Sequence, residues 1–197
     1  MRRNILPYIV AIVIAVVFIG CSKAPVINVY RLNVPQVQTE STSVYKDKSI
    51  KVSFPQSLKE PMSEKMLFSY AENDRGAYQN SQWSNNLGRI LQGTFIEVFD
   101  RSRLFKIVLS DMSTLEENYR LESTIFDFEH QVRGRDSYAV VSIQFTLINA
   151  DTGRLVKSKR FSYQEPTPTT DAKGYAIATD RVIVKLSQDL LQWLKSN

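Results

Sequence analysis

The only thiol in the chain, Cys21, lies at the end of its longest apolar stretch, in the sequence VVFIGCSK. A lone cysteine cannot form an intramolecular disulfide, and it has no second thiol with which to share a metal ion. The chemistry open to it is therefore that of a single sulfur that can be covalently modified. The residues that precede it indicate which modification this is.

Residues 1–20 have the pattern of an export signal. Arg2 and Arg3 give a basic start, residues 5–19 are apolar, and the small residue Gly20 precedes Cys21. The apolar stretch is shorter than the roughly 20 residues that span a bilayer without tilting. Gly20-Cys21 resembles a bacterial lipobox, in which a signal peptidase cuts before the cysteine and lipid is attached to its sulfur. We therefore expect a lipoprotein signal peptide at 1–20 and lipidation of Cys21; the alternative is an uncleaved signal anchor with an idle thiol.

Lipid on Cys21 would determine where the protein resides. Several acyl chains hold a protein on a membrane without a spanning helix, whereas one chain is marginal. The expected location is the bacterial cell envelope, with the protein lipid-anchored and facing the periplasm. Ser22 rather than aspartate follows the cysteine, which by the sorting rule of enteric bacteria favours the outer membrane. Residues 21–28 then form a lipid-anchored leader, and residues 29–197 a single periplasmic domain.

The charge of the mature chain gives no support to nucleic-acid binding. Removal of residues 1–20 leaves 177 residues, which suffice for one domain with a sizeable core. The same cleavage removes Arg2 and Arg3, so that 23 basic residues face 20 acidic ones and the net charge falls from +5 to +3. A nucleic-acid partner normally requires a much stronger basic excess.

Two other groups of residues could perform chemistry, and neither predicts an enzyme. Asp151-Thr152-Gly153 is the tripeptide of aspartic proteases, but it occurs once, and such enzymes need two facing carboxylates. Asp and Gly are also typical of a tight turn. His130 is the only histidine and has no nucleophile that the sequence pairs with it. The sequence predicts no enzyme, no cofactor and no metal site; a hydrolase would need a constellation that it does not show.

Four aromatic residues lie close together in the sequence, within 16 positions: Phe68, Tyr70, Tyr78 and Trp83. The polar residues 72–76 interrupt them. Aromatic side chains beside polar residues are typical of a partner-binding surface. The alternative is a corner of the core, where a strand meets a helix. Both interpretations stay open at the level of the sequence.

Period-two alternation of apolar residues predicts a series of strands. These lie at residues 29–32, 50–54, 66–70, 105–109, 119–128, 139–147 and 155–163. In the segment 119–128, Leu121 and Ile125 share one face, but Phe126 and Phe128 fall on the opposite parity. This change predicts a β-bulge or a strand covered on both faces. Residues 149–153 read as a hairpin turn.

Two segments have helical spacing instead. The first contains Trp83, Leu87, Ile90, Leu91, Val98 and Phe99, with Ser81 as a candidate N-cap. The second has one apolar stripe of Thr179, Val182, Ile183, Leu186, Leu190, Trp193 and Leu194, which forms either core or a subunit interface. The order of elements predicts an α+β fold, in which two long helices pack on a mainly antiparallel sheet.

The chain resembles the ABC-type transport auxiliary lipoproteins, the paraquat-inducible-type lipoproteins that accompany MCE-domain lipid carriers. The resemblance rests on the order of these features: the lipobox at Cys21, Tyr30-Arg31-Leu32, Ile50-Lys51-Val52, Met66–Tyr70, Tyr78, Trp83, Leu104-Phe105, the strands from Tyr119 and Tyr138, and the final helix with Trp193. It covers nearly the whole mature chain.

The resemblance implies a non-catalytic lipoprotein that assists lipid transport between inner and outer membranes. Its implied partners are the membrane, through the N-terminal lipid, an MCE-domain protein and ABC transporter subunits. A ring-like homo-oligomer would match a hexameric MCE target, although no residue specifies one. The alternative from another functional class is an outer-membrane assembly lipoprotein or an activator of peptidoglycan synthases, because these also use small α+β domains on lipid tethers.

Overall fold

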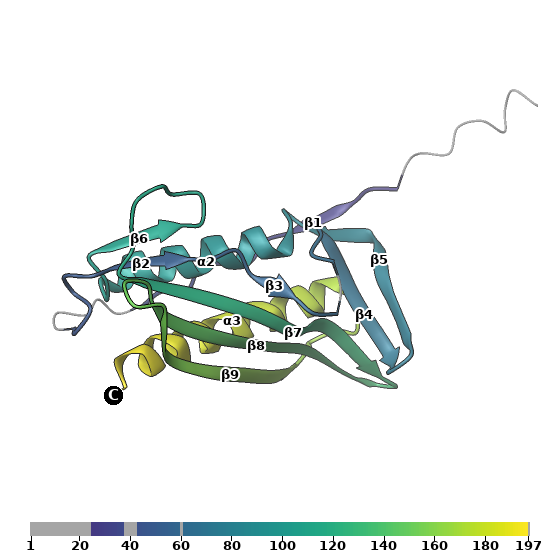
Figure 1. Ribbon diagram of the computed structural model, residues 1–197. Coiled ribbons are helices and arrows are strands. Elements are labelled where there is room, and N and C mark those ends of the chain that lie inside the picture. Colours follow the sequence, from purple (N-terminus) through teal and green to yellow (C-terminus); the bar gives the residue numbers. More distant parts are fainter. Residues whose placement is uncertain (1–24, 38–42, 60, 197) are drawn as a thin grey trace, which may run out of the picture.

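The computed structural model describes residues 25–37, 43–59 and 61–196, which form one mixed sheet and two helices (Figure 1). The elements in chain order are β1 (Asn28–Tyr30), β2 (Ser49–Val52), β3 (Gln56–Ser57), β4 (Lys65–Ala71), β5 (Asp74–Trp83), α2 (Leu87–Ser102), β6 (Ile107–Ser110), β7 (Tyr119–Arg133), β8 (Asp136–Asn149), β9 (Arg154–Pro166) and α3 (Ala172–Lys195). The predicted signal peptide and Cys21 lie outside the described residues.

The sheet is organised around β7. On one side β7 pairs antiparallel with β8, and β8 with β9, in long hairpin ladders. On its other side β7 pairs in parallel with three strands in succession, namely β2, β3 and β4. β4 forms an antiparallel hairpin with β5, and the short strands β1 and β6 add parallel edges to β5 and β2. The long ladders are therefore antiparallel, and the parallel pairs are short.

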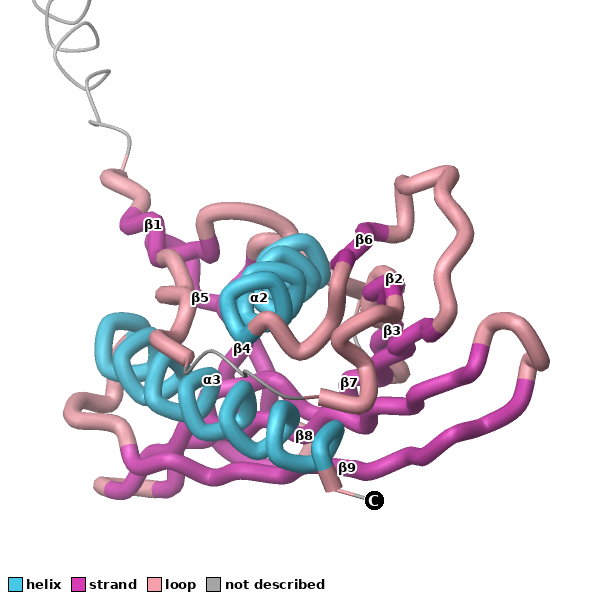
Figure 2. Tube along the Cα trace, turned by 90° about the vertical axis from the view of Figure 1, so that its left-hand side faces the viewer, coloured by secondary structure: helices cyan, strands magenta, loops and turns pink. Residues whose placement is uncertain are grey.

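Both helices lie on one side of this curved sheet and enclose the core with it (Figure 2). The ring of Phe95 from α2 meets that of Phe145 from β8 edge-on, with centroids 5.1 Å apart. Phe161 of β9 contacts Trp193 of α3 in the same manner at 6.1 Å. Aromatic pairs of this geometry add to the stability that burial alone provides. The α+β fold predicted from the sequence is confirmed.

The predicted irregularity in β7 is a β-bulge. The register between β7 and β8 shifts between Ile125 and Asp127, so that Phe126 is the inserted residue. Its ring lies under the guanidinium of Arg160, which is 3.7 Å from the ring centroid. Phe128, beyond the bulge, is buried on the core side. One extra residue thus explains the change of parity seen in the sequence.

Helix α2 begins later than its spacing predicts. It starts at Leu87, and the side chain of Asn86, rather than Ser81, caps it by accepting a hydrogen bond of 2.9 Å from the backbone N–H of Gly88. Trp83 instead ends β5. Its side chain is nevertheless buried in the core, because Trp83 occupies an inward-facing position of the strand. The sequence pattern therefore predicted the burial of Trp83 correctly but assigned it to the wrong element.

Helix α3 is held at both ends by polar contacts. Asp171 caps the N-terminus, where its carboxylate accepts a hydrogen bond of 2.8 Å from the N–H of Gly174. At the other end the ammonium of Lys157 from β9 donates to the carbonyls of Trp193 and Leu194, at 2.7 and 3.1 Å. A cation at the C-terminus of a helix also interacts favourably with its dipole. The Lys157 contact ties the C-terminal end of α3 to β9.

Candidate functional site

All four aromatic residues singled out in the sequence belong to the β4–β5 hairpin, but only three of them cluster together. Trp83 is buried, with 1% of its surface exposed, and packs edge-on against Phe128 and Tyr175. It is therefore a core residue. Phe68 and Tyr78 are half-buried and Tyr70 is 54% exposed. We call Phe68, Tyr70 and Tyr78 the aromatic face.

The aromatic face is a packed cluster. The ring of Phe68 lies between its two neighbours, with its centroid 5.1 Å from that of Tyr70 and 5.1 Å from that of Tyr78. The ring also covers Gly76 on the facing strand, where an added Cβ would lie 2.7 Å from Phe68 Cζ. Glycine at this position therefore allows the ring to lie flat over the hairpin. Tyr70 is thus presented to solvent on a fixed support.

A buried stack anchors the aromatic face to α3. The Tyr78 hydroxyl is 2.7 Å from His130 Nδ1, and the His130 ring is parallel to that of Tyr175, with centroids 5.2 Å apart. His130 and Tyr175 are fully buried, and the Nε2 of His130 and the hydroxyl of Tyr175 have no hydrogen-bond partner among the described residues. The sequence did not place this histidine beside Tyr78, because the two residues lie 52 positions apart on different strands.

Burial sets the protonation states in the stack. Desolvation lowers the pKa of His130, and the nearby Asp171 opposes that shift only in part. Desolvation, with smaller contributions from Tyr70 and Asp171, raises the pKa of Tyr78 to about 12. At neutral pH the imidazole is therefore uncharged, while the Tyr78 hydroxyl keeps its proton and can donate it to Nδ1.

The stack predicts a loss of stability in mild acid. Because the pKa of His130 is lower in the folded than in the unfolded chain, its contribution is complete above the unfolded value of about 6.5 and is lost as the pH falls through the folded value. We expect the free energy of unfolding, measured by urea titration, to fall between pH 7.5 and pH 5.5. In the variant His130→Gln this dependence should be smaller. Equal pH dependence in the two proteins would contradict the assignment.

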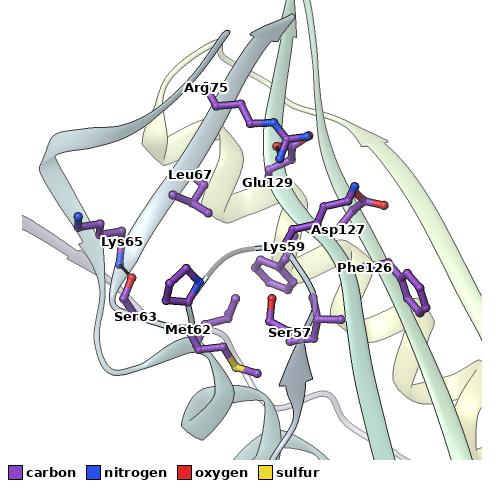
Figure 3. Close-up of a pocket in the computed structure, with 14 residues that line it drawn as sticks. Ser57, Lys59, Met62, Ser63, Lys65, Leu67, Arg75, Phe126, Asp127 and Glu129 are labelled. Carbon is purple, nitrogen blue, oxygen red and sulfur yellow. Dashed lines mark hydrogen bonds and ion pairs between the residues drawn. The ribbon is translucent and has the colours of Figure 1, made fainter. Parts of the chain in front are cut away.

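A second feature is a break in the sheet beside the bulge (Figure 3). Between the pairs that Ile125 forms with β3 and His130 forms with β4, no described strand pairs with β7 on this side. A cavity of about 40 Å³ lies there, enough for a few water molecules. Two ion pairs, Lys59–Asp127 and Arg75–Glu129, border it. This size does not suit a lipid or a cofactor, and the lining combines the two ion pairs with apolar side chains such as Leu67, Ile125 and Phe128.

The remaining candidates have structural roles or no neighbours of the required kind. Asp151-Thr152-Gly153 lies in the turn between β8 and β9, where Gly153 has a φ of 66°. In the described part of the chain, no three histidine, cysteine or carboxylate side chains converge as a metal site would require. Among the same residues, no helix has the length and apolarity to cross a bilayer.

Comparison with known proteins gives one family and several structures of the same fold. A family model described as "ABC-type transport auxiliary lipoprotein component" matches residues 30–190. The crystal structure of a Xanthomonas campestris protein is similar with a TM-score of 0.72 and 18% identity, over 86% of this chain and 94% of that one. PelC of Paraburkholderia phytofirmans, crystallised as a dodecamer, is similar with a TM-score of 0.51 and 14% identity, over 82% and 96%. The curated proteins include no match.

Proposed function

This chain belongs to the family of ABC-type transport auxiliary lipoprotein components, and from that premise we propose that it assists an MCE-type system in moving lipid between the inner and outer membranes. The family match, which extends over residues 30–190, is the observation that carries the proposal. The protein acts through binding and not catalysis. Its lipid on Cys21 holds it at the periplasmic side of the outer membrane.

The aromatic face is the proposed docking surface for the transporter partners. Aromatic residues that combine exposure with a rigid support lose little conformational freedom on binding, and tyrosine is enriched at interface hot spots. Tyr70 is 54% exposed and its ring is held by that of Phe68. Phe68 and Tyr78 would complete the contact, whereas Trp83 supports the surface from within the core.

A ring of several copies is part of the proposal. PelC of Paraburkholderia phytofirmans, which shares the fold, forms a dodecamer in its crystals. Rings of this kind use heterologous contacts that close on themselves. A ring would present several aromatic faces to one symmetric MCE assembly, and multiple weak contacts would then act together.

Capture of the intact protein from detergent-solubilised native membranes, followed by mass spectrometry, tests this function. We expect an MCE-domain protein and ABC transporter subunits to be recovered with it. The variant Tyr70→Ala should weaken binding about 30-fold and lower their recovery accordingly, since loss of a hot-spot aromatic costs about 2 kcal/mol. The control Leu155→Ala removes a side chain that is 64% exposed on β9, and recovery should not change.

Two results would contradict the proposal in different ways. Full recovery of the partners with Tyr70→Ala would exclude the aromatic face as the docking surface. Recovery of an outer-membrane assembly protein or a peptidoglycan synthase, in place of the transporter subunits, would favour the alternative function for a lipid-anchored α+β domain.

A further inference from the structure

We propose that the segment Pro25–Arg31 lies in the headgroup region of the bilayer, so that the β1 end of the sheet is the membrane-facing end of the protein. We call these residues the seat segment. The inference rests on the lipid anchor at Cys21 proposed above. It goes beyond that anchor because it assigns an orientation to the domain and a membrane contact to side chains of the chain itself.

The length of chain between the lipid and the fold limits the distance to the membrane. Three residues, 22–24, separate Cys21 from Pro25, where the described structure begins, so the chain advances four positions between them. A chain of that length spans at most about 14 Å when fully extended. Strand β1 starts only three residues later, at Asn28. The β1 end of the sheet must therefore remain near the bilayer surface.

The seat segment exposes apolar side chains at this place. Val26 is 82% exposed, Ile27 51% and Val29 56%. They lie within four positions, interrupted only by Asn28, and are not isolated surface residues. Contiguous exposed apolar side chains are typical of contact with a protein or a membrane. A bilayer within reach of the lipid anchor can cover all three.

The basic residues that flank the seat segment in the sequence favour an anionic surface. Lys23 and Arg31 flank the apolar residues, and the first acidic residue after Cys21 is Glu40. Basic residues beside a membrane anchor are attracted to anionic headgroups. Apolar side chains between two cations thus match the two layers of a bilayer interface, with the apolar atoms placed deeper than the charges.

The seat segment is fixed to the domain, so its position defines an orientation. Asn28 and Tyr30 of β1 are in register with Ser81 and Trp83 of β5, and the Tyr30 carbonyl accepts a hydrogen bond of 2.7 Å from the N–H of Ser84. Just beyond it, the backbone N–H and the side-chain amide of Asn33 donate to the carboxylate of Asp180 on α3, at 3.0 and 2.7 Å. The leader is therefore joined to both the sheet and α3.

This orientation directs the aromatic face away from the membrane. Lys65, at the start of β4, pairs with Gln82, which also pairs with Val29 of the seat segment. Tyr70 lies five residues further along β4, which corresponds to about 17 Å at the rise of a strand. The hairpin thus extends from the seat segment toward the aromatic face (Figure 1). A partner in the periplasm could reach Tyr70 while the seat segment stays in the bilayer.

Depth-dependent fluorescence in vesicles tests whether the seat segment lies in the bilayer. The lipidated full-length variant Ile27→Cys has one free thiol, because the chain contains no cysteine besides Cys21. It is labelled with an NBD dye and reconstituted into phosphatidylethanolamine–phosphatidylglycerol vesicles that contain nitroxide-labelled phospholipid. The control is Leu155→Cys, 64% exposed on β9, which among the described strands pairs only with β8, whereas β1 pairs only with β5. We expect a blue-shifted emission and strong nitroxide quenching at position 27, and neither at position 155.

A charge placed in the seat segment provides the second measurement. Val29→Asp should reduce the quenching of the dye at position 27, whereas Val156→Asp, at a valine that is 42% exposed on β9, should not. All variants should float with the vesicles, because the lipid on Cys21 is unchanged.

The outcomes distinguish the membrane contact of the seat segment from the lipid anchor on Cys21, on which it depends. Flotation with no quenching at position 27 would contradict the membrane contact of the seat segment but not the lipid anchor. A blue shift that persists in detergent and grows with protein concentration would also contradict the membrane contact, because a second copy of the chain would then cover these residues. Failure of the unmodified protein to float would contradict the lipid anchor, and the membrane contact of the seat segment would then lose its basis.

Discussion

Replacing Leu186 with alanine is expected to lower the free energy of unfolding by about 2–5 kcal/mol, the usual cost of truncating a fully buried leucine. Leu186 has no exposed surface, and neither have Val182, Ile183 and Leu190 on the same stripe of α3. The stripe packs on β8 and β9, so the deleted atoms leave a cavity between two rigid layers. Such a cavity collapses poorly, and the lining atoms lose their contacts.

The measurement is urea denaturation of the two proteins under identical conditions, with the slope of the transition checked for equality. Val184→Ala is the matched control, because Val184 lies on the same helix but is 38% exposed, and its truncation should change stability by less than about 1 kcal/mol. An unchanged midpoint for Leu186→Ala would mean that this face of α3 is not the core in solution.

The second helix could be predicted from the sequence because its pattern is local. A stripe at helical spacing specifies one buried face whatever it packs against. Every residue predicted for the stripe, from Thr179 to Leu194, is buried within the chain, which favours core over a subunit interface. The start was harder to place, because α3 begins at Ala172, in a stretch where glycine and small residues weaken the periodic signal.

The bulge in β7 could be predicted for a related reason. An inserted residue changes the parity of every inward position after it, so Ile125 and Phe128 carry the information themselves. The sequence could not tell the bulge from a strand that is covered on both faces. That choice depends on Arg160 of β9, whose guanidinium occupies the outer side of Phe126.

Strand β5 escaped prediction because its residues do not alternate in hydrophobicity. It contains Gly76, Asn80 and several other polar residues, and most of its positions are exposed or half-buried. Its position comes from pairing with β4 and β1, which no local pattern reveals. Without β5, Trp83 was assigned to the helical stripe, and the aromatic residues could not be divided into a core member and three surface members.

The candidate site was accessible from sequence only in part. Aromatic composition pointed to Phe68, Tyr70 and Tyr78, which the hairpin does bring together. The support from His130 and Tyr175 depends on contacts between β5, β7 and α3. Such contacts join residues that are distant in the chain, and a single sequence contains no record of them.

Replacing Cys21 with alanine is expected to abolish lipidation completely. The sulfur is the only atom in the chain that could carry a thioether-linked lipid, since no other cysteine exists. A signal peptidase that requires the cysteine would also leave residues 1–20 attached. The variant should then stay at the membrane as a larger precursor, held by its apolar stretch alone.

Metabolic labelling with a fatty-acid probe, followed by electrophoresis, measures both effects in cells that express the two proteins. The unmodified protein should appear as a labelled band of mature size, and Cys21→Ala as an unlabelled band of lower mobility. Ser22→Ala is the control, because it alters the adjacent residue and retains the sulfur, so its label should persist. Labelled protein of mature size in Cys21→Ala would show that lipid is attached elsewhere, and the seat segment would then lose the tether that places it at the bilayer.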